Sequence, residues 1–157
     1  MTDPIQLETI SEAHYGDDYK SVFLTQYRDF VASASDISDR RHEANKFFST
    51  INTVLLMASG LIPTKSSEFN WQVALAGGLL CMIWLFMIAS YRELNGAKFK
   101  VILEMEKQLP VATYATEYRF KKAAKSSNLS SVESMVPKLF MGAYFLVFVT
   151  HFVGKYL

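Results

Sequence analysis

The chain is poor in the residues that usually carry chemistry. Among 157 residues there is one cysteine, Cys81, so no intramolecular disulfide and no Cys-x-x-Cys pair can form. The three histidines, His14, His42 and His151, are scattered, and such spacing does not predict a shared metal. The sequence also lacks Gly-x-Ser-x-Gly, His-Glu-x-x-His and glycine-rich phosphate-loop motifs. We therefore predict no catalytic residue, no metal site and no cofactor, and we expect that the protein is not an enzyme.

Charge is missing from three long windows. Asp, Glu, Lys and Arg are absent from residues 47–64, 69–91 and 139–154, which are 18, 23 and 16 residues long. As helices these windows would measure about 27, 34 and 24 Å, against a hydrocarbon core of about 30 Å. The second spans with tilt, and flanking residues extend the other two. We predict transmembrane helices over 47–64, 69–91 and 139–155, with a buried or interfacial helix as the alternative for the third.

The distribution of positive charge predicts the orientation. Residues 1–46 carry five Lys and Arg, and the 92–138 connection carries nine. The 63–70 hairpin and the C-terminal tail carry one each. By the positive-inside rule, the N-terminus and the 92–138 connection face the cytoplasm. The first forty residues are polar and acidic, so we expect no signal peptide, and the localisation predicted is the bacterial cytoplasmic, or inner, membrane.

The cytoplasmic segments have helical patterns. Apolar residues between Tyr19 and Ile37 follow the i, i+3, i+4, i+7 spacing of one helix face, which makes residues 1–46 an amphipathic helical segment. One long helix continuing into the first span is expected, with a break near residues 33–38 as the alternative. In the connection, a helix over 92–108 is stopped by Pro110 and a second follows over about 116–125. The fold class predicted is an all-α integral membrane protein with a helical cytoplasmic layer.

A polar stripe follows one face of the first span. Its members recur at spacings of about three and four: Arg41, Asn45, Ser49, Asn52 and Thr53. Polar side chains at membrane depth avoid lipid, so this face either packs against another helix or lines the central pore of an oligomer. On the second span, Ala74 and Gly78 form a small-xxx-small pair that Gly77 widens, which favours close helix packing.

Arginines stand at the cytoplasmic end of this stripe. Arg40 and Arg41 are expected to anchor the span at lipid phosphates, and one of them to pair with Asp36, Glu43 or a glutamate of the connection. The basic cluster Lys121, Lys122 and Lys125 adjoins the membrane, so we interpret it as contacting anionic lipid headgroups and not nucleic acid.

Two stretches carry a family resemblance. Residues 38–53 read SDRRHEANKFFSTINT, and residues 91–118 contain LNGAKF and EKQLPVATYATEY. They resemble the RipA family of small octameric bacterial inner-membrane proteins, whose pattern is R-R-x-x-A-N-x-F-F-x-x-x-N-T followed by L-N-x-A-K-F and E-x-x-L-P-x-x-x-Y-x-x-E-[WY]. The resemblance covers about 80 residues in order, within the chain of 157.

What the resemblance implies is an octamer with a helical cytoplasmic assembly, linked to envelope homeostasis and stress tolerance. It brings no catalytic residues. We expect a homo-oligomeric scaffold with a cytoplasmic protein partner. Alternatives are an oligomeric pore along the polar stripe and, third, a lipid-acting enzyme. Inter-subunit contacts are expected in the cytoplasmic layer from Arg40, Glu104, Glu106, Leu109, Pro110, Tyr114, Glu117 and Tyr118.

Overall fold

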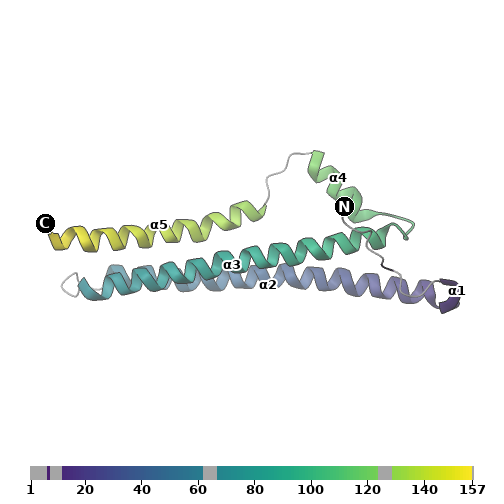
Figure 1. The fold of residues 1–157 in the computed structure, drawn as a ribbon, viewed down its shortest axis with the longest axis horizontal. Coiled ribbons are helices and arrows are strands. Elements are labelled where there is room, and N and C mark those ends of the chain that lie inside the picture. Colours follow the sequence, from purple (N-terminus) through teal and green to yellow (C-terminus); the bar gives the residue numbers. More distant parts are fainter. Residues whose placement is uncertain (1–6, 8–11, 62–66, 124–128, 157) are drawn as a thin grey trace. The chain divides into compact units, whose positions relative to one another are not determined.

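The protein folds into helices. A computed structural model describes residue 7 and residues 12–61, 67–123 and 129–156. These residues form five helices and no strand: α1 (Glu12–Tyr15), α2 (Tyr19–Leu61), α3 (Ser67–Glu106), α4 (Thr113–Ala123) and α5 (Leu129–Tyr156) (Figure 1). The prediction of an all-α fold is confirmed for the described part of the chain.

Helix α2 is continuous through the predicted cytoplasmic segment and into the first apolar window. No proline or glycine lies between Tyr19 and Ser59 to interrupt its backbone hydrogen bonds. The prediction of one long helix is therefore confirmed, and the alternative of a break near residues 33–38 is wrong. Before it, Gly16 adopts a φ of 90°, a left-handed conformation that glycine takes without steric cost. This residue turns the chain from α1 into α2.

Helix α3 joins the second apolar window to the first helix of the connection. It ends at Glu106, two residues before the predicted end at Gln108, and its last turn closes through hydrogen bonds from Lys107, Gln108 and Leu109 to carbonyls three residues earlier. Pro110 follows and prevents continuation. Helix α4 starts at Thr113, three residues earlier than predicted, because a capping carboxylate described below holds its first turn. Of the hairpin expected at 63–70, residues 67–70 belong to α3, whereas residues 63–66 and the predicted helix end at Lys125 lie outside the described residues.

The contacts divide the chain into two compact units. Unit 1 comprises Met1–Asp39 and Glu93–Ser126, and unit 2 comprises Arg40–Arg92 and Ser127–Leu157. Helices α2 and α3 contribute to both, whereas α4 belongs to unit 1 and α5 to unit 2. In unit 1, α2 and α3 bury four apolar side chains, namely Ala34, Ile37, Ile102 and Met105.

Unit 2 packs three helices around two adjoining apolar clusters. One contains Val73, Ala74, Cys81 and Tyr144, and the other contains Phe48, Trp84 and Ile88. The Phe48 and Trp84 rings stack with their centroids 5.8 Å apart, and Phe140 of α5 packs against both clusters. Aromatic side chains thus supply much of the contact area between α2, α3 and α5.

Gly77 permits the closest approach within unit 2. A Cβ atom built on Gly77 would stand 2.1 Å from Cζ of the Tyr144 ring, whereas none of the described atoms lies within 4 Å of a Cβ at Gly78. The Tyr144 ring is buried, and its hydroxyl donates a 3.1 Å hydrogen bond to the backbone carbonyl of Asn52. The ring therefore has little freedom to move away, and glycine at position 77 is required by the packing of α5 on α3.

The apolar helices differ in length. Among the described residues, one helical stretch is long and apolar enough to cross a membrane, Trp71–Glu106, and Met135–His151 is an apolar helix of shorter length. Residues 71–91 of the second predicted span, 69–91, lie within the first of these stretches. The three-span topology as a whole stays a prediction.

Replacement of Gly77 by alanine should destabilise unit 2. The added methyl group clashes with the Tyr144 ring, and overpacking of this kind costs about 1–3 kcal/mol. Gly96→Ala is the matched control, because Gly96 lies exposed in α3 with open space at its Cβ, and alanine there should stabilise the helix by up to about 1 kcal/mol. Thermal unfolding of both variants in nanodiscs checks this. Equal midpoints for the two variants would contradict the close contact.

Candidate functional site

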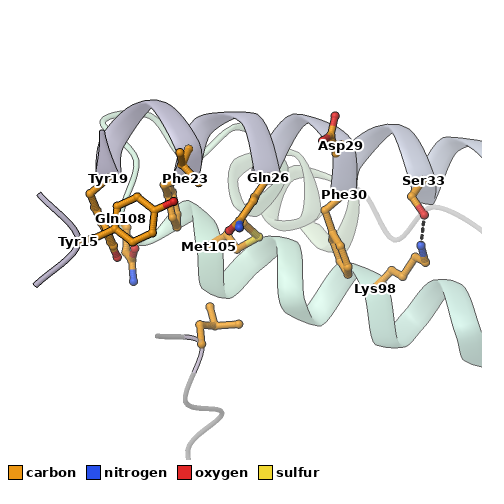
Figure 2. A pocket seen from close by; sticks show the side chains of 12 residues that line it. Tyr15, Tyr19, Phe23, Gln26, Asp29, Phe30, Ser33, Lys98, Met105 and Gln108 are labelled. Atoms are coloured by element: carbon orange, nitrogen blue, oxygen red, sulfur yellow. Dashed lines mark hydrogen bonds between the residues drawn. The ribbon is translucent and has the colours of Figure 1, made fainter. Parts of the chain in front are cut away.

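Unit 1 contains a groove lined largely by aromatic side chains. Its volume is about 570 Å³, within the range of ligand-binding clefts. We call it the aromatic groove, and its lining residues are Leu7, Tyr15, Tyr19, Val22, Phe23, Gln26, Asp29, Phe30, Ser33, Lys98, Met105 and Gln108. Figure 2 shows that the labelled side chains come mainly from α2 along one side and from α3 along the other.

The aromatic wall follows the helical repeat of α2. Tyr19 and Phe23, one turn apart, stack with ring centroids 6.3 Å apart, and Tyr15 meets Tyr19 edge-on at 6.1 Å. Tyr19 and Phe23 belong to the amphipathic pattern that predicted the helix, but sequence spacing alone does not distinguish a face that packs fully from one that leaves a groove. The groove is therefore a feature that the sequence analysis missed.

Lys98 supplies the positive charge of the groove. Its ammonium group lies 5.1 Å from the centroid of the Phe30 ring and donates a hydrogen bond to the Ser33 hydroxyl (Figure 2). The ring face and the hydroxyl together hold the ammonium at one end of the groove. Asp29, exposed on the rim, carries a carboxylate. The groove thus combines a broad apolar wall with a few polar groups, which suits an apolar segment that also carries polar atoms.

Glu106 forms a second polar centre in unit 1, at the end of α3. Only 1% of its surface is exposed, and its carboxylate accepts four hydrogen bonds. The backbone amides of Tyr114 and Ala115 donate at 2.8 and 2.9 Å, and the hydroxyls of Thr113 and Tyr27 donate at 3.0 and 3.2 Å. We call these five residues the carboxylate cluster.

The carboxylate cluster connects three helices. Glu106 caps the N-terminal turn of α4, where free amides and the helix dipole favour negative charge, and Tyr27 ties the same carboxylate to α2. Apart from this cap, Tyr114 of α4 contacts the Phe99 ring edge-on at 5.9 Å, and none of the described side chains of α4 is fully buried. The position of α4 therefore depends largely on Glu106.

The hydrogen bonds set the charge state of this centre. Burial opposes the charge of Glu106, but the amides of Tyr114 and Ala115 and the two hydroxyls outweigh it and hold the pKa of the carboxyl below its usual range. Burial, followed by the negative charge and hydrogen bond of Glu106, raises the pKa of Tyr27 above its ordinary value. Glu106 is thus a buried carboxylate at neutral pH, stabilised by donors and not by a cation.

The other residues expected in the cytoplasmic layer lie mostly at the surface. Glu104 pairs with Lys107 at 2.5 Å, and Leu109 and Tyr114 are half-buried. Exposed side chains include Arg40, Pro110, Glu117, Tyr118, Lys121 and Lys122. Lys125 lies outside the described residues. Glu106, predicted as an inter-subunit contact, has its hydrogen bonds within its own chain because it caps α4.

In unit 2 the polar stripe of α2 serves largely for packing within one chain. Asn45 accepts a 2.7 Å hydrogen bond from the Trp84 indole, and Asn52, with no exposed surface, accepts one from the Cys81 thiol. The Asn52 amide group also donates to the Phe48 carbonyl at 2.8 Å. The Asn52 side chain is thus enclosed within its own protomer, and the pore along this stripe stays a prediction.

The remaining members of the stripe divide between packing and exposure. Arg41 forms an ion pair with Glu133 of α5 at 3.6 Å, and both side chains are 19% exposed. A glutamate of the 92–138 segment was among the partners expected for one of the two arginines. Ser49 is half-buried and accepts at its carbonyl from the exposed Thr53 hydroxyl. The stripe thus connects α2 to α3 at its centre and to α5 at its start.

A comparison with known families shows which family of membrane proteins the chain belongs to. A family model described as the octameric membrane protein family (8xMP) matches residues 24–153. The chain belongs to this family. No curated protein and no solved structure matches it.

Membership of the octameric membrane protein family confirms the coarser part of the resemblance: a helical membrane protein of a family that forms octamers. The match begins within α2, at Leu24, and ends near the end of α5, so it includes the whole carboxylate cluster. Of the aromatic groove it includes seven of the twelve lining residues, whereas the aromatic residues Tyr15, Tyr19 and Phe23 precede it. The narrower likeness to the RipA family stays a prediction.

Glu106→Gln should destabilise unit 1 in a pH-dependent way. Glutamine keeps one acceptor oxygen but places an amide nitrogen opposite a backbone donor, so a loss of about 1–3 kcal/mol is expected at neutral pH. Since the folded pKa of Glu106 lies below the unfolded value of about 4.3, its stabilisation is complete above that pH and is lost as pH falls through the folded pKa. The difference between wild type and variant should shrink in that acidic window.

Unfolding curves monitored by circular dichroism from pH 7 to pH 3 measure this difference. Tyr27→Phe is the control, because it removes one of the four hydrogen bonds and keeps the carboxylate. It should cost less and preserve the pH dependence. A Glu106→Gln deficit that is constant across the whole pH range would contradict the role of the charged carboxylate.

Proposed function

We propose that the protein is a homo-octameric scaffold of the bacterial inner membrane that binds a cytoplasmic protein partner in support of envelope homeostasis and stress tolerance. In this proposal three helices span the membrane, over 47–64, 69–91 and 139–155. The N-terminal segment and the 92–138 connection lie in the cytoplasm, and the protein carries out no catalysis. The octameric family and the distribution of Lys and Arg support this arrangement.

The aromatic groove is the observation that carries the proposal. A soluble partner needs a surface outside the membrane, and this groove lies in unit 1, which contains none of the three apolar windows. Its volume of about 570 Å³ accommodates a few apolar side chains of a peptide segment, and aromatic walls bind such segments with little loss of side-chain entropy.

An octamer would multiply the effect of a modest groove. Eight copies of the same groove on one membrane assembly raise the effective concentration for a partner that has several binding segments. Weak single contacts then yield stable recruitment to the membrane, which is the behaviour expected of a scaffold.

Helix α4 supports attachment of the same layer to lipid. Arg119, Lys121 and Lys122 are exposed beside Phe120, whose side chain is 72% exposed. Basic residues near a membrane gain about 1 kcal/mol each from anionic headgroups. We include Lys125 in this lipid contact on the sequence pattern alone.

Phe23→Ser tests the groove. The substitution removes an aromatic wall, and loss of such an anchor typically weakens binding by about tenfold or more. Leu24→Ser is the matched control, because Leu24 is the next residue and is exposed outside the groove lining. A photo-crosslinking amino acid at Gln26, on the groove, should capture a protein partner in growing cells, and Phe23→Ser should reduce that product where Leu24→Ser does not.

The same two variants should differ in complementing the envelope-stress sensitivity of a deletion strain. Both must first be shown to assemble, by size-exclusion chromatography in detergent. If Phe23→Ser assembles and complements as well as Leu24→Ser, the aromatic groove is not the binding surface of a scaffold.

A further inference from the structure

Unit 2 carries an apolar groove between α3 and α5. We call it the membrane groove; its volume is about 290 Å³, and its lining is almost entirely apolar. Helix α3 contributes Ala74, Leu75, Gly78, Leu79 and Met82, and α5 contributes the facing wall. The groove lies at the depth of the second apolar window, where bulk water is excluded in a membrane.

The floor of the membrane groove is unfilled by its own chain. Gly78 stands at the floor, and none of the described atoms lies within 4 Å of a Cβ built on it, in contrast to Gly77. The rims are large and exposed, with Leu79 at 54% and Phe145 at 65%. Small residues between large rims form the shape that admits a side chain of another helix.

Unit 2 has a second exposed apolar surface, on α2. Phe47, Val54 and Met57 of α2 are each about 60% exposed, and their spacing of seven and three residues places them along one helix face. We call this face the apolar ridge. It points away from the face of α2 that carries Phe48 and Asn52, which contact α3, so the ridge and the membrane groove are two different surfaces of one protomer.

Contacts within the protomer set the depth of both surfaces. Asn52 meets Cys81 and Phe48 meets Trp84, so each step forward along α2 corresponds to a step backward along α3. Val54 therefore lies at about the same depth in the membrane as Leu79. Met57, three residues later on α2, lies at about the depth of Leu75, which is earlier on α3. Copies related by rotation about the membrane normal keep equal depth, so the ridge of one copy is level with the groove of its neighbour.

Closed rings impose a further requirement. A cyclic assembly with more than two copies uses a heterologous contact, in which two different surfaces of each protomer meet head to tail. The protein belongs to an octameric family, and unit 2 offers one concave and one convex apolar surface at matching depth.

We propose that the apolar ridge of α2 inserts into the membrane groove between α3 and α5 of the adjacent copy, with Val54 packed over Gly78, and that this contact repeats around the octamer. The inference rests on the octameric assembly of the family and not on the scaffold function. Lipid is the other possible occupant, since an acyl chain also fills apolar grooves. The matched depth and the convex counterpart on the same molecule favour a second copy.

Cysteine crosslinking in native membranes tests the contact. In a Cys81→Ala background, the double variant Val54→Cys/Leu79→Cys should form, on mild oxidation, a ladder of covalent oligomers reaching eight copies. Each single variant should form none, because the two cysteines of a heterologous contact lie on different surfaces. The control Val54→Cys/Ala76→Cys places the second cysteine at an exposed position outside the groove and should not form the ladder.

Gly78→Leu gives an independent measurement. The Cβ at position 78 meets none of the described atoms within 4 Å, and leucine fills the groove beyond it, so unit 2 should keep its tryptophan fluorescence, from Trp71 and Trp84, while the octamer separates into smaller species in mass photometry. Gly96→Leu, exposed in unit 1, should leave the octamer intact.

Three results would overturn the proposal. Covalent dimers from either single variant would show a two-fold symmetric contact. A double variant that remains an octamer without forming a ladder would place the interface elsewhere. A Gly78→Leu variant that stays octameric would assign the groove to lipid. None of these results bears on the scaffold function, which is measured by partner capture at the aromatic groove.

Discussion

The hydrogen bonds around Asn52 hold the three helices of unit 2 together. In an apolar environment a polar side chain must find its partner within the protein, and Asn52 does so by accepting from Cys81 on α3 and donating to its own helix. Its backbone carbonyl accepts from Tyr144 on α5. Tyr144 also fills the space left by Gly77 on α3. Asn52, Gly77 and Tyr144, one residue on each helix, therefore together fix the distances between α2, α3 and α5. The surrounding apolar clusters then pack in a single register.

Unit 1 uses the same physical device with a charged group. A carboxylate buried without a cation is costly, and Glu106 is stable there because four donors replace its hydration. Two of those donors are the free amides at the start of α4, which would otherwise need water or another cap. The hydrogen bonds that cap α4 therefore offset the free-energy cost of removing the Glu106 carboxylate from water. This explains how a short helix with no fully buried side chain is held in a defined place.

Much of this architecture follows from patterns within the sequence. The absence of glycine and proline predicted the continuity of α2, Pro110 predicted the end of α3, and the stripe through Asn45 and Asn52 predicted a face that avoids lipid. These are local properties of one helix. The partners Trp84, Cys81 and Glu133 depend on which helices meet and at what register, and a periodic pattern does not contain that information. For the same reason the sequence predicted an inter-subunit contact for Glu106 but not its cap on α4: Pro110 predicts that the helix ends, whereas the direction of the following helix, which brings its amides to Glu106, is not contained in the spacing.

The internal use of the polar stripe constrains how the protein can act as an oligomer. Asn45 and Asn52 bond within their own protomer, so an axis lined by them would first require breaking the contacts that hold α2 to α3. What unit 2 leaves exposed on its described helices is mainly apolar, including the apolar ridge and the rims of the membrane groove. Association between such surfaces depends on shape more than on polar recognition, because lipid competes equally for apolar contact. Polar recognition of a partner is therefore proposed only for unit 1, where aromatic rings and Lys98 line one groove and Asp29 is exposed at its rim.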